Sequence, residues 1–167
     1  MNIIIRQWKL SDADDLANAI SNLNVQNRLH DGIPYPYTEN DGQQFISTML
    51  AADKNDLFAF AIEYDGKVVG SISAERQKNI HRKTAELGYY IAEEYWGKGI
   101  ATQAVKLLCD YVFKNSDIIR IFAVVLAHND ASCKVLEKSG FQCEGTLRQS
   151  AVKCGKVTDV KVYALIR

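Results

Sequence analysis

Hydrophobic residues recur with two different periods along the first part of the chain, and they predict a strand followed by two helices. Residues 2–8 are rich in β-branched side chains and predict a first strand. Ser11 is a typical N-cap, and apolar residues at helical spacing predict a helix over roughly residues 12–23. Residues 31–37 contain turn residues and two prolines and predict a loop, after which Thr38 can cap a second helix.

The middle of the chain predicts three consecutive strands, over residues 57–64, 67–75 and 84–91. The first two flank Asp65-Gly66, a dipeptide suited to the type I′ turn of a β-hairpin. The third follows a polar turn and is rich in β-forming residues, although its alternation is less regular.

The last third of the chain predicts two more helices and three more strands. An amphipathic helix follows residues 97–99, and the apolar run 118–126 is typical of a buried strand. A short helix over residues 130–139 ends at Gly140, and two strands flank residues 154–156. A strand that follows a crossover helix usually lies parallel to the strand before it, so this order predicts an α/β fold with a mixed sheet.

Length and charge narrow the classes of function. The 167 residues suit one domain, which we expect to span residues 1–167. Twenty basic side chains balance twenty acidic ones, so the chain lacks the positive field of a binder of bare nucleic acid. No apolar stretch approaches the ~20 residues that cross a bilayer, and the N-terminal apolar run is too short for a signal peptide. We therefore expect a cytoplasmic protein with no membrane partner.

Cysteine and histidine spacing gives no support for a metal site. The four cysteines form no CxxC pair, and the three histidines are scattered. We expect free thiols in a reducing compartment and no bound metal.

The most informative segment is a glycine-bearing turn between a strand and a helix. Gly97 and Gly99 let the backbone approach a ligand, and the first N–H groups of the helix point outward, a geometry that binds phosphate. The segment lacks the Gly-Lys-Ser/Thr ending of a Walker loop and the three glycines of a dinucleotide fingerprint. A plain tight connection and a nucleotide-binding regulatory domain remain alternatives at this point.

Five segments together resemble the GNAT acetyltransferases, in particular the RimJ/RimL-like branch. Residues 96–101 resemble the pyrophosphate loop Gln/Arg-x-x-Gly-x-Gly/Ala, with Trp96 at the first position. The other matching segments are 129–132 with 136–141, the proline loop 34–38, and a C-terminal hairpin marked by 144–148, Gly155 and Asp159. The resemblance extends over nearly the whole chain.

This resemblance implies a fold and a reaction. The fold would be a mixed, mostly antiparallel seven-stranded sheet with one splayed parallel strand pair, flanked by about four helices. The chain would be an N-acetyltransferase in which a primary amine directly attacks acetyl-CoA, the co-substrate. By the same resemblance, the acceptor would be the N-terminal amine of a protein or peptide.

The resemblance also implies which residues hold the coenzyme. The backbone of Tyr89, Tyr90 and Ile91 would pair with the pantetheine arm, and an N–H near Tyr89 would stabilise the oxyanion. Asn129 and Ser132 would reach the arm from the other side. The pyrophosphate would lie against Trp96, Gly97, Lys98, Gly99, Ile100, Ala101 and Thr102.

Glu86 and Ser132 are the candidate catalytic residues. An α-amine has a pKa near ~8, so a weak base suffices to deprotonate it, and Glu86 on the strand beside the acetyl site is our candidate. A structurally paired carboxylate is the alternative. Many GNAT enzymes protonate the leaving thiolate with a tyrosine where this chain has Leu136. Ser132 is the substitute, although a serine at a helix start can simply bond to backbone, and the enzyme could need no acid at all.

The acceptor side is the least determined. Tyr35 and Tyr37 are candidates for lining the acceptor pocket, and Asp159 for holding a cationic substrate. A polyamine or other small amine is an alternative acceptor, supported by acidic residues near the proline loop. A non-catalytic acyl-CoA-binding module is an alternative of another class. Both a monomer and a homodimer fit the sequence.

Overall fold

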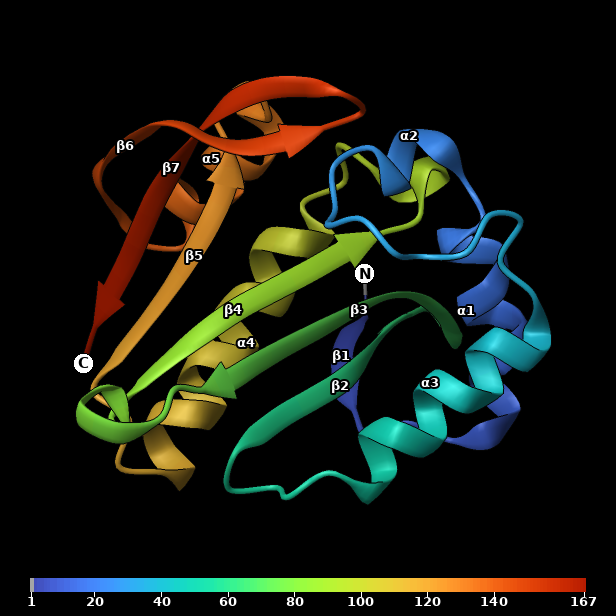
Figure 1. Ribbon diagram of the computed structural model, residues 1–167. Helices are drawn as coiled ribbons and strands as arrows, with labels where there is room; N and C mark the ends of the chain where they lie inside the picture. The colour runs from blue at the N-terminus through green and yellow to red at the C-terminus, as the bar shows by residue number, and fades with distance from the viewer. Residues whose placement is uncertain (1) are drawn as a thin grey trace.

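A seven-stranded mixed sheet forms the centre of the computed structural model, which describes residues 2–167 (Figure 1). The strands are β1 (Ile3–Arg6), β2 (Leu57–Tyr64), β3 (Lys67–Arg76), β4 (Thr84–Ile91), β5 (Arg120–Leu126), β6 (Gln142–Lys153) and β7 (Lys156–Ile166). The helices are α1 (Ala13–Ile20), α2 (Leu23–Gln26), α3 (Glu39–Ala51), α4 (Ile100–Asn115) and α5 (Asp130–Lys138). The spatial order of the strands is β1-β2-β3-β4-β5-β7-β6, and β4–β5 is the parallel pair.

Helices cover both faces of the sheet, but each face over a different part. On one face, α4 and α5 bury apolar side chains against the strands, and the largest core cluster lies here, with Leu108, Val112, Ile121 and Leu136 fully buried. On the other face, α1 and α3 cover the half of the sheet formed by β1 to β3 (Figure 1). The middle of that second face, over β4 and β5, therefore lies outside the cover of the two helices.

An ion-pair network joins the end of β1 to the start of α1. The Arg6 guanidinium donates to both Asp12 carboxylate oxygens at 2.8 and 2.9 Å and to Glu63 at 2.5 Å. Burial acts to raise the pKa of Asp12, but the bonds from Arg6 and from the Lys9 backbone N–H outweigh it and lower that pKa. The Asp12 side chain is only 7% exposed, so its charge depends on these partners.

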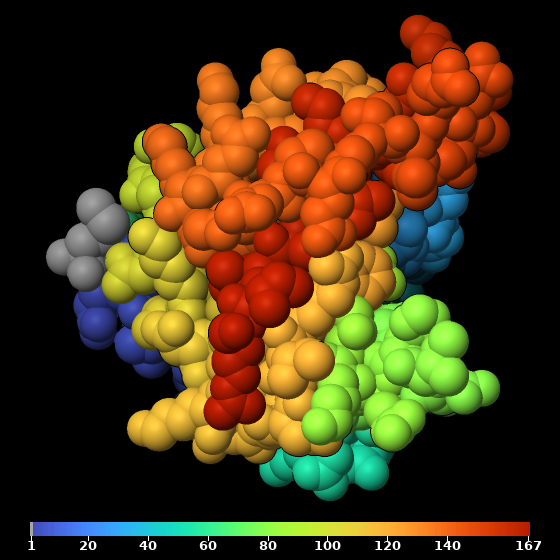
Figure 2. Space-filling model, turned by 90° about the vertical axis from the view of Figure 1, so that its left-hand side faces the viewer, coloured from blue at the N-terminus to red at the C-terminus, as the bar shows by residue number. Residues whose placement is uncertain are grey.

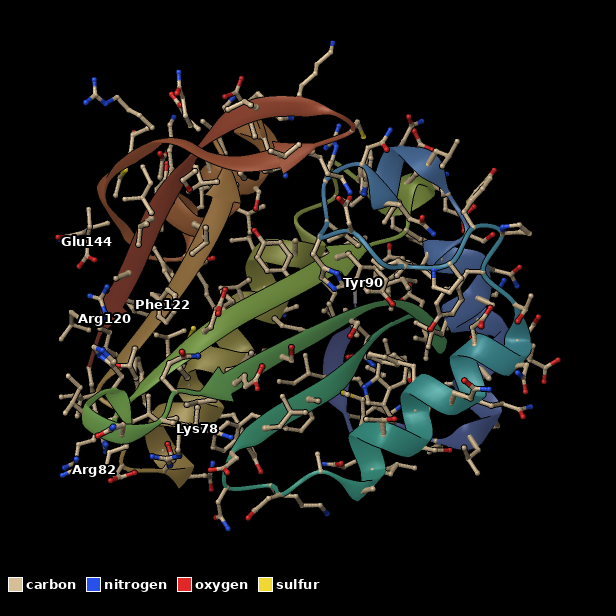
Figure 3. All side chains as sticks on the ribbon, viewed as in Figure 1. Lys78, Arg82, Tyr90, Arg120, Phe122 and Glu144 are labelled. Carbon is tan, nitrogen blue, oxygen red and sulfur yellow. The ribbon has the colours of Figure 1, made fainter. Side chains whose placement is uncertain are left out.

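The β6–β7 hairpin extends the sheet beyond β5 and projects from the body of the protein (Figure 2). Its outer strand β6 is exposed along most of its length. At the opposite end of the hairpin from its tip, Arg120 donates two hydrogen bonds to Glu144, which ties β5 to the edge strand (Figure 3).

The predicted fold class is confirmed, with small differences at the N-terminal end. Strands at 57–64 and 84–91 have the predicted bounds, and the strand pair on either side of α4 is parallel as expected. The first helix ends at Ile20 rather than near residue 23, because the Asn22 side chain accepts from two backbone N–H groups and starts the short helix α2. With α2, the described residues form five α-helices, where about four were expected. Within residues 2–167, no helix has both the length and the apolar composition needed to cross a bilayer.

Candidate active site

The two parallel strands separate halfway along their length. Cross-strand pairing joins β4 to β5 only from Thr84 to Glu86, opposite residues 120–122. Beyond that point β4 remains paired with β3 as far as Ile91, and β5 with β7 as far as Leu126. In the described ladder the facing edges of the two strands are therefore left without a partner strand. Backbone N–H and C=O groups along such an edge can pair with an extended ligand.

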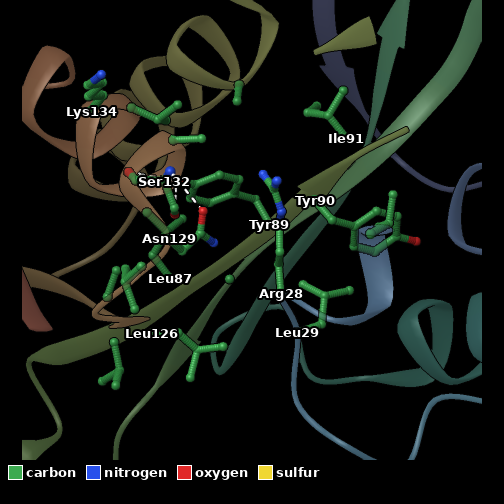
Figure 4. Close-up of a pocket in the computed structure, with 18 of the residues that line it drawn as sticks. Arg28, Leu29, Leu87, Tyr89, Tyr90, Ile91, Leu126, Asn129, Ser132 and Lys134 are labelled. Carbon is green, nitrogen blue, oxygen red and sulfur yellow. Dashed lines mark hydrogen bonds between the residues drawn. The ribbon is translucent and has the colours of Figure 1, made fainter. Parts of the chain in front are cut away.

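A cavity of about 730 Å³ opens between the separated strands (Figure 4). The walls come from both strands, the turn into α4, the first turns of α5, residues 25–31 and the tip of the β6–β7 hairpin. Of the residues predicted from the sequence, the cavity is lined by Glu86, Tyr89, Tyr90, Ile91, Trp96, Gly97, Gly99, Ile100, Ala101, Thr102, Asn129 and Ser132.

The turn at the start of α4 has the geometry of an anion site. Gly97 and Gly99 have φ of 74° and 77°, and Gly99 is the N-cap of this 16-residue helix with no side-chain capping bond. A Cβ on either glycine would meet no atom within 4 Å, so glycine is favoured here by the left-handed backbone and not by crowding. The free N–H groups and the positive end of the helix dipole both favour a phosphate at this turn.

Trp96 links this turn to the end of β4. Its indole Nε1–H donates to the Ile91 carbonyl at 2.8 Å, and the Arg28 guanidinium carbon lies 4.2 Å from the centre of its ring. The indole therefore fixes the bend between strand and turn through one hydrogen bond and one stacking contact. Lys98 points elsewhere: its Nζ lies 4.9 Å from the centre of the Tyr95 ring, and the residue does not line the cavity.

Tyr89 and Ser132 meet across the cavity from different elements. The Tyr89 hydroxyl lies 2.7 Å from Ser132 Oγ (Figure 4). Asn129 caps α5 by accepting from the Ser132 backbone N–H at 3.3 Å, which sets where that serine lies. Burial raises the pKa of Tyr89 to about 12, partly offset by the Ser132 hydrogen bond, and the nearby Cys133 raises it further. The phenol is therefore neutral throughout the physiological range.

Glu86 lies where the strands begin to separate, on the sheet face opposite α4. Its direct neighbour in the β3–β4 ladder is Glu75, so two carboxylates share one face. Partial desolvation, with the repulsion from Glu75 second, raises the pKa of Glu86 although the residue is exposed to solvent. Neither carboxylate forms a salt bridge with any residue of the described chain. A carboxylate with a raised pKa is a better proton acceptor than an ordinary one.

The three predicted acceptor residues lie away from this cavity. Tyr35 is 57% exposed, and the Tyr37 hydroxyl donates to the Asp41 carbonyl at 3.3 Å. Asp159 accepts from the Gln149 backbone N–H at 2.7 Å within the β6–β7 hairpin. None of the three lines the cavity, and their proposed roles stay predictions.

Residues 27–31 and the hairpin tip meet over the cavity. None of them is among the predicted site residues, although Asp31 is one of the acidic residues that support the polyamine alternative. Lys153 donates to Asp31 at 2.9 Å, and the Cys154 thiol lies 3.5 Å from the side-chain oxygen of Asn27. Asp31 and Lys153 are 122 positions apart in the sequence, and no local spacing pairs them. Arg28 also lines this wall, and only the exposed positive charge beside a proline loop could have drawn attention to it.

Lysines dominate the charged residues along the α5 side of the cavity. Lys134 and Lys138 are one turn apart and both line it. Together with the helix start of α4, they give that side of the cavity a positive character suited to phosphate groups. Among residues 2–167, no three His, Cys, Asp or Glu side chains come close enough to form a metal site.

Comparison with known proteins gives a consistent family. Residues 2–142 match the family model described as an acetyltransferase (GNAT) domain. The chain is 31% identical to the "Putative ribosomal N-acetyltransferase YdaF" of Bacillus subtilis, over 99% of this chain and 92% of that protein. It is 35% identical to the spermidine N(1)-acetyltransferase of Escherichia coli, but over 53% of this chain and 47% of that protein. The crystal structure of the ribosomal-protein-S5-alanine acetyltransferase from Vibrio fischeri is similar with a TM-score of 0.87 and 26% identity, covering 99% of this chain and 93% of that one.

Proposed function

The chain belongs to the acetyltransferase (GNAT) family, and on this premise we propose that it transfers the acetyl group of acetyl-CoA to the N-terminal amine of a protein or peptide. The chain is an acetyl-CoA-dependent N-acetyltransferase; the identity of the acceptor and the roles of single residues are the proposal. The observation that carries the proposal is the cavity between separated β4 and β5, which joins an anion-binding turn to an unpaired carboxylate.

The residues present fit the coenzyme. The pyrophosphate would lie against the backbone of residues 97–102, where two left-handed glycines leave room for close approach. The pantetheine arm would pair with the open edge of β4 at residues 89–91 and approach Asn129 and Ser132 on the other side. Bound there, the coenzyme supplies an activated acyl group as a thioester.

Glu86 is the proposed general base. The acceptor α-ammonium must lose a proton before its nitrogen attacks, and Glu86 removes this proton directly or through one water. The neutral nitrogen then forms a bond to the acetyl carbon and releases its second proton to solvent. The carbon–sulfur bond breaks, and its electron pair leaves on sulfur. The N–H near Tyr89 stabilises the negative charge on the acetyl oxygen during this exchange. Glu86 finally returns its proton to solvent.

The charges around the cavity favour a single amine over a polyamine. A polyamine carries several ammonium groups and needs several free carboxylates. Asp31 and Glu86 are the acidic residues that line the cavity, and Asp31 is already paired with Lys153. Of the other acidic residues near the proline loop, Asp41 forms a capping box with Thr38 at the start of α3. The similarity to a spermidine acetyltransferase keeps small amines in the test below.

The test measures thiol release from acetyl-CoA with a panel of acceptors. Peptides with a free N-terminus are compared with N-acetylated twins, and spermidine and spermine are run beside them. We expect release with free peptides and none with their blocked twins. Release with polyamines alone would refute the proposed acceptor.

Glu86→Gln tests the proposed base, with Glu94→Gln as the matched control. Glu94 is an exposed glutamate near the coenzyme turn that does not line the cavity. We expect Glu86→Gln to lower kcat by about 100-fold near neutral pH, and the control to leave it unchanged. The loss should shrink as pH rises through the acceptor pKa near ~8, because the amine then deprotonates without help. A pH-independent loss would argue against a role as base.

A further inference from the structure

The Tyr89 side chain has no role in the proposal so far, yet its hydroxyl forms a part-buried hydrogen bond in the cavity wall. The residue lies on β4 and is partly buried against the core beneath α4 and α5. Its hydroxyl reaches Ser132 Oγ at 2.7 Å and the Ser132 carbonyl at 3.4 Å. One turn further along α5 lies Leu136, a fully buried apolar side chain that carries no hydroxyl. Tyr89, Tyr90 and Tyr95 line the cavity, and among the described hydrogen bonds it is the Tyr89 hydroxyl that reaches α5 from there.

The hydrogen-bond geometry leaves the Ser132 proton two possible directions. If Ser132 donates to Tyr89, its proton is consumed inside the pair. If Tyr89 donates to Ser132 Oγ, the serine proton is free to point into the cavity. Serine accepts and donates at the same oxygen, so the second arrangement satisfies the buried phenol and still presents a donor to a ligand. Asn129 fixes the Ser132 backbone through its N–H, so the pair is held from two sides.

We propose that Tyr89 is a positioning residue for the acetyl transfer, holding Ser132 Oγ so that the serine hydroxyl donates a hydrogen bond to the departing coenzyme sulfur. This inference rests on the proposed function. Ser132 touches the sulfur, and Tyr89 acts through Ser132.

The chemistry of the pair is hydrogen bonding and not proton transfer. The pKa of Tyr89 is about 12, whereas a thiol has a pKa near ~8.5. Moving a proton from the phenol to the thiolate would be unfavourable by roughly three powers of ten. Sulfur therefore leaves with its electron pair as a thiolate that accepts a hydrogen bond from Ser132, and solvent protonates it after release. Such a donor strengthens its bond as negative charge develops on sulfur, so it stabilises the transition state more than the bound thioester.

A double-mutant cycle tests whether Tyr89 acts through Ser132. We expect Ser132→Ala to lower kcat by roughly 10- to 100-fold and Tyr89→Phe by roughly 2- to 10-fold, with the KM for acetyl-CoA within about twofold in both. In the Ser132→Ala background, Tyr89→Phe should have no further effect on kcat. Tyr111→Phe is the control, because that tyrosine packs against Phe58 and Phe60 away from the cavity. Equal Tyr89→Phe losses in both backgrounds would overturn the proposal.

A second measurement needs no acceptor and so does not depend on which amine is the substrate. CoA, with its free thiol, and desulfo-CoA are titrated into the protein by calorimetry between about pH 6 and 9, a range that includes the usual thiol pKa of ~8.5. If Ser132 stabilises the thiolate, CoA gains affinity over desulfo-CoA as pH rises, with the pKa of the bound thiol lowered by about one unit. Both Ser132→Ala and Tyr89→Phe should remove this gain, and Tyr111→Phe should keep it. A merely structural contribution of Tyr89 would weaken both ligands equally at every pH.

The outcomes separate the two proposals. A pH-dependent preference for CoA in the wild type that Tyr89→Phe abolishes supports the positioning role, even if every peptide fails as an acceptor. A preference that Tyr89→Phe leaves intact overturns that role while the proposed function stands. If neither ligand binds, both the proposed function and the role of Tyr89 are refuted.

Discussion

The turn at the start of α4 offers the sharpest test of coenzyme binding, through Gly99→Ala. Gly99 has φ of 77°, and an added Cβ would meet no protein atom within 4 Å. The protein itself would therefore lose only the cost of a left-handed alanine, about 1 kcal/mol. For a chain of this length such a loss lowers Tm by about 2–4 °C. The new methyl group would stand where we propose that the phosphate approaches the backbone.

The expected loss of coenzyme affinity is larger than the loss of stability. A hydrogen bond from a backbone N–H to a charged phosphate contributes about 1.5–3 kcal/mol. Losing one such bond corresponds to CoA binding weakened by roughly 10- to 100-fold. Calorimetric titration with CoA measures the affinity, and a thermal melt of the same sample measures Tm.

Gly66→Ala is the matched control. Gly66 has φ of 86°, lies in the β2–β3 hairpin turn and has the same open space where a methyl group would be added. It should lose the same few degrees of Tm and bind CoA like the wild type. If the two variants have equal Tm and equal CoA affinity, the backbone of the turn does not bind the pyrophosphate, and the reasoning from the left-handed glycines is wrong.

Three further predictions follow from the contacts described. Glu75→Gln should move the acidic limb of kcat/KM to lower pH, because the proposed base Glu86 acts when deprotonated and Glu75 contributes to its raised pKa. An unmoved limb would exclude this coupling. Trp96→Phe keeps an aromatic ring but removes the indole hydrogen bond to the Ile91 carbonyl at the end of β4, so we expect about 1 kcal/mol less stability. We also expect a larger rise in KM for acetyl-CoA than for the acceptor. Arg6→Ala should cost about 3 kcal/mol, because Asp12 is left buried without its partner. Since the pKa of Asp12 is lowered in the folded state, the stability of the wild type should decrease as the pH is lowered through that pKa. Chemical denaturation of Arg6→Ala should show a smaller decrease.

Much of the backbone could be predicted because its signals are local. The strands at 57–64 and 84–91 follow from runs of β-forming residues, and α4 follows from an apolar stripe after a glycine turn. Period and turn chemistry depend on neighbours within a few positions, so they are visible in the sequence. The short helix α2 was missed because four residues carry too little periodicity, and a single capping asparagine decides where it begins.

The sequence by itself determined the order of the elements, the glycine turn and the resemblance that names the coenzyme. It also placed Glu86 and Ser132 among the candidate catalytic residues, a role that the experiments above must decide. Only the tertiary structure decided that Tyr89 meets Ser132, that Glu75 lies beside Glu86, and that residues 27–31 close over the cavity with the hairpin tip. Those contacts join residues from separate elements, and strand register and the divergence of β4 from β5 bring them together. Register and divergence result from packing the whole sheet against its helices, so no local pattern along the chain encodes them.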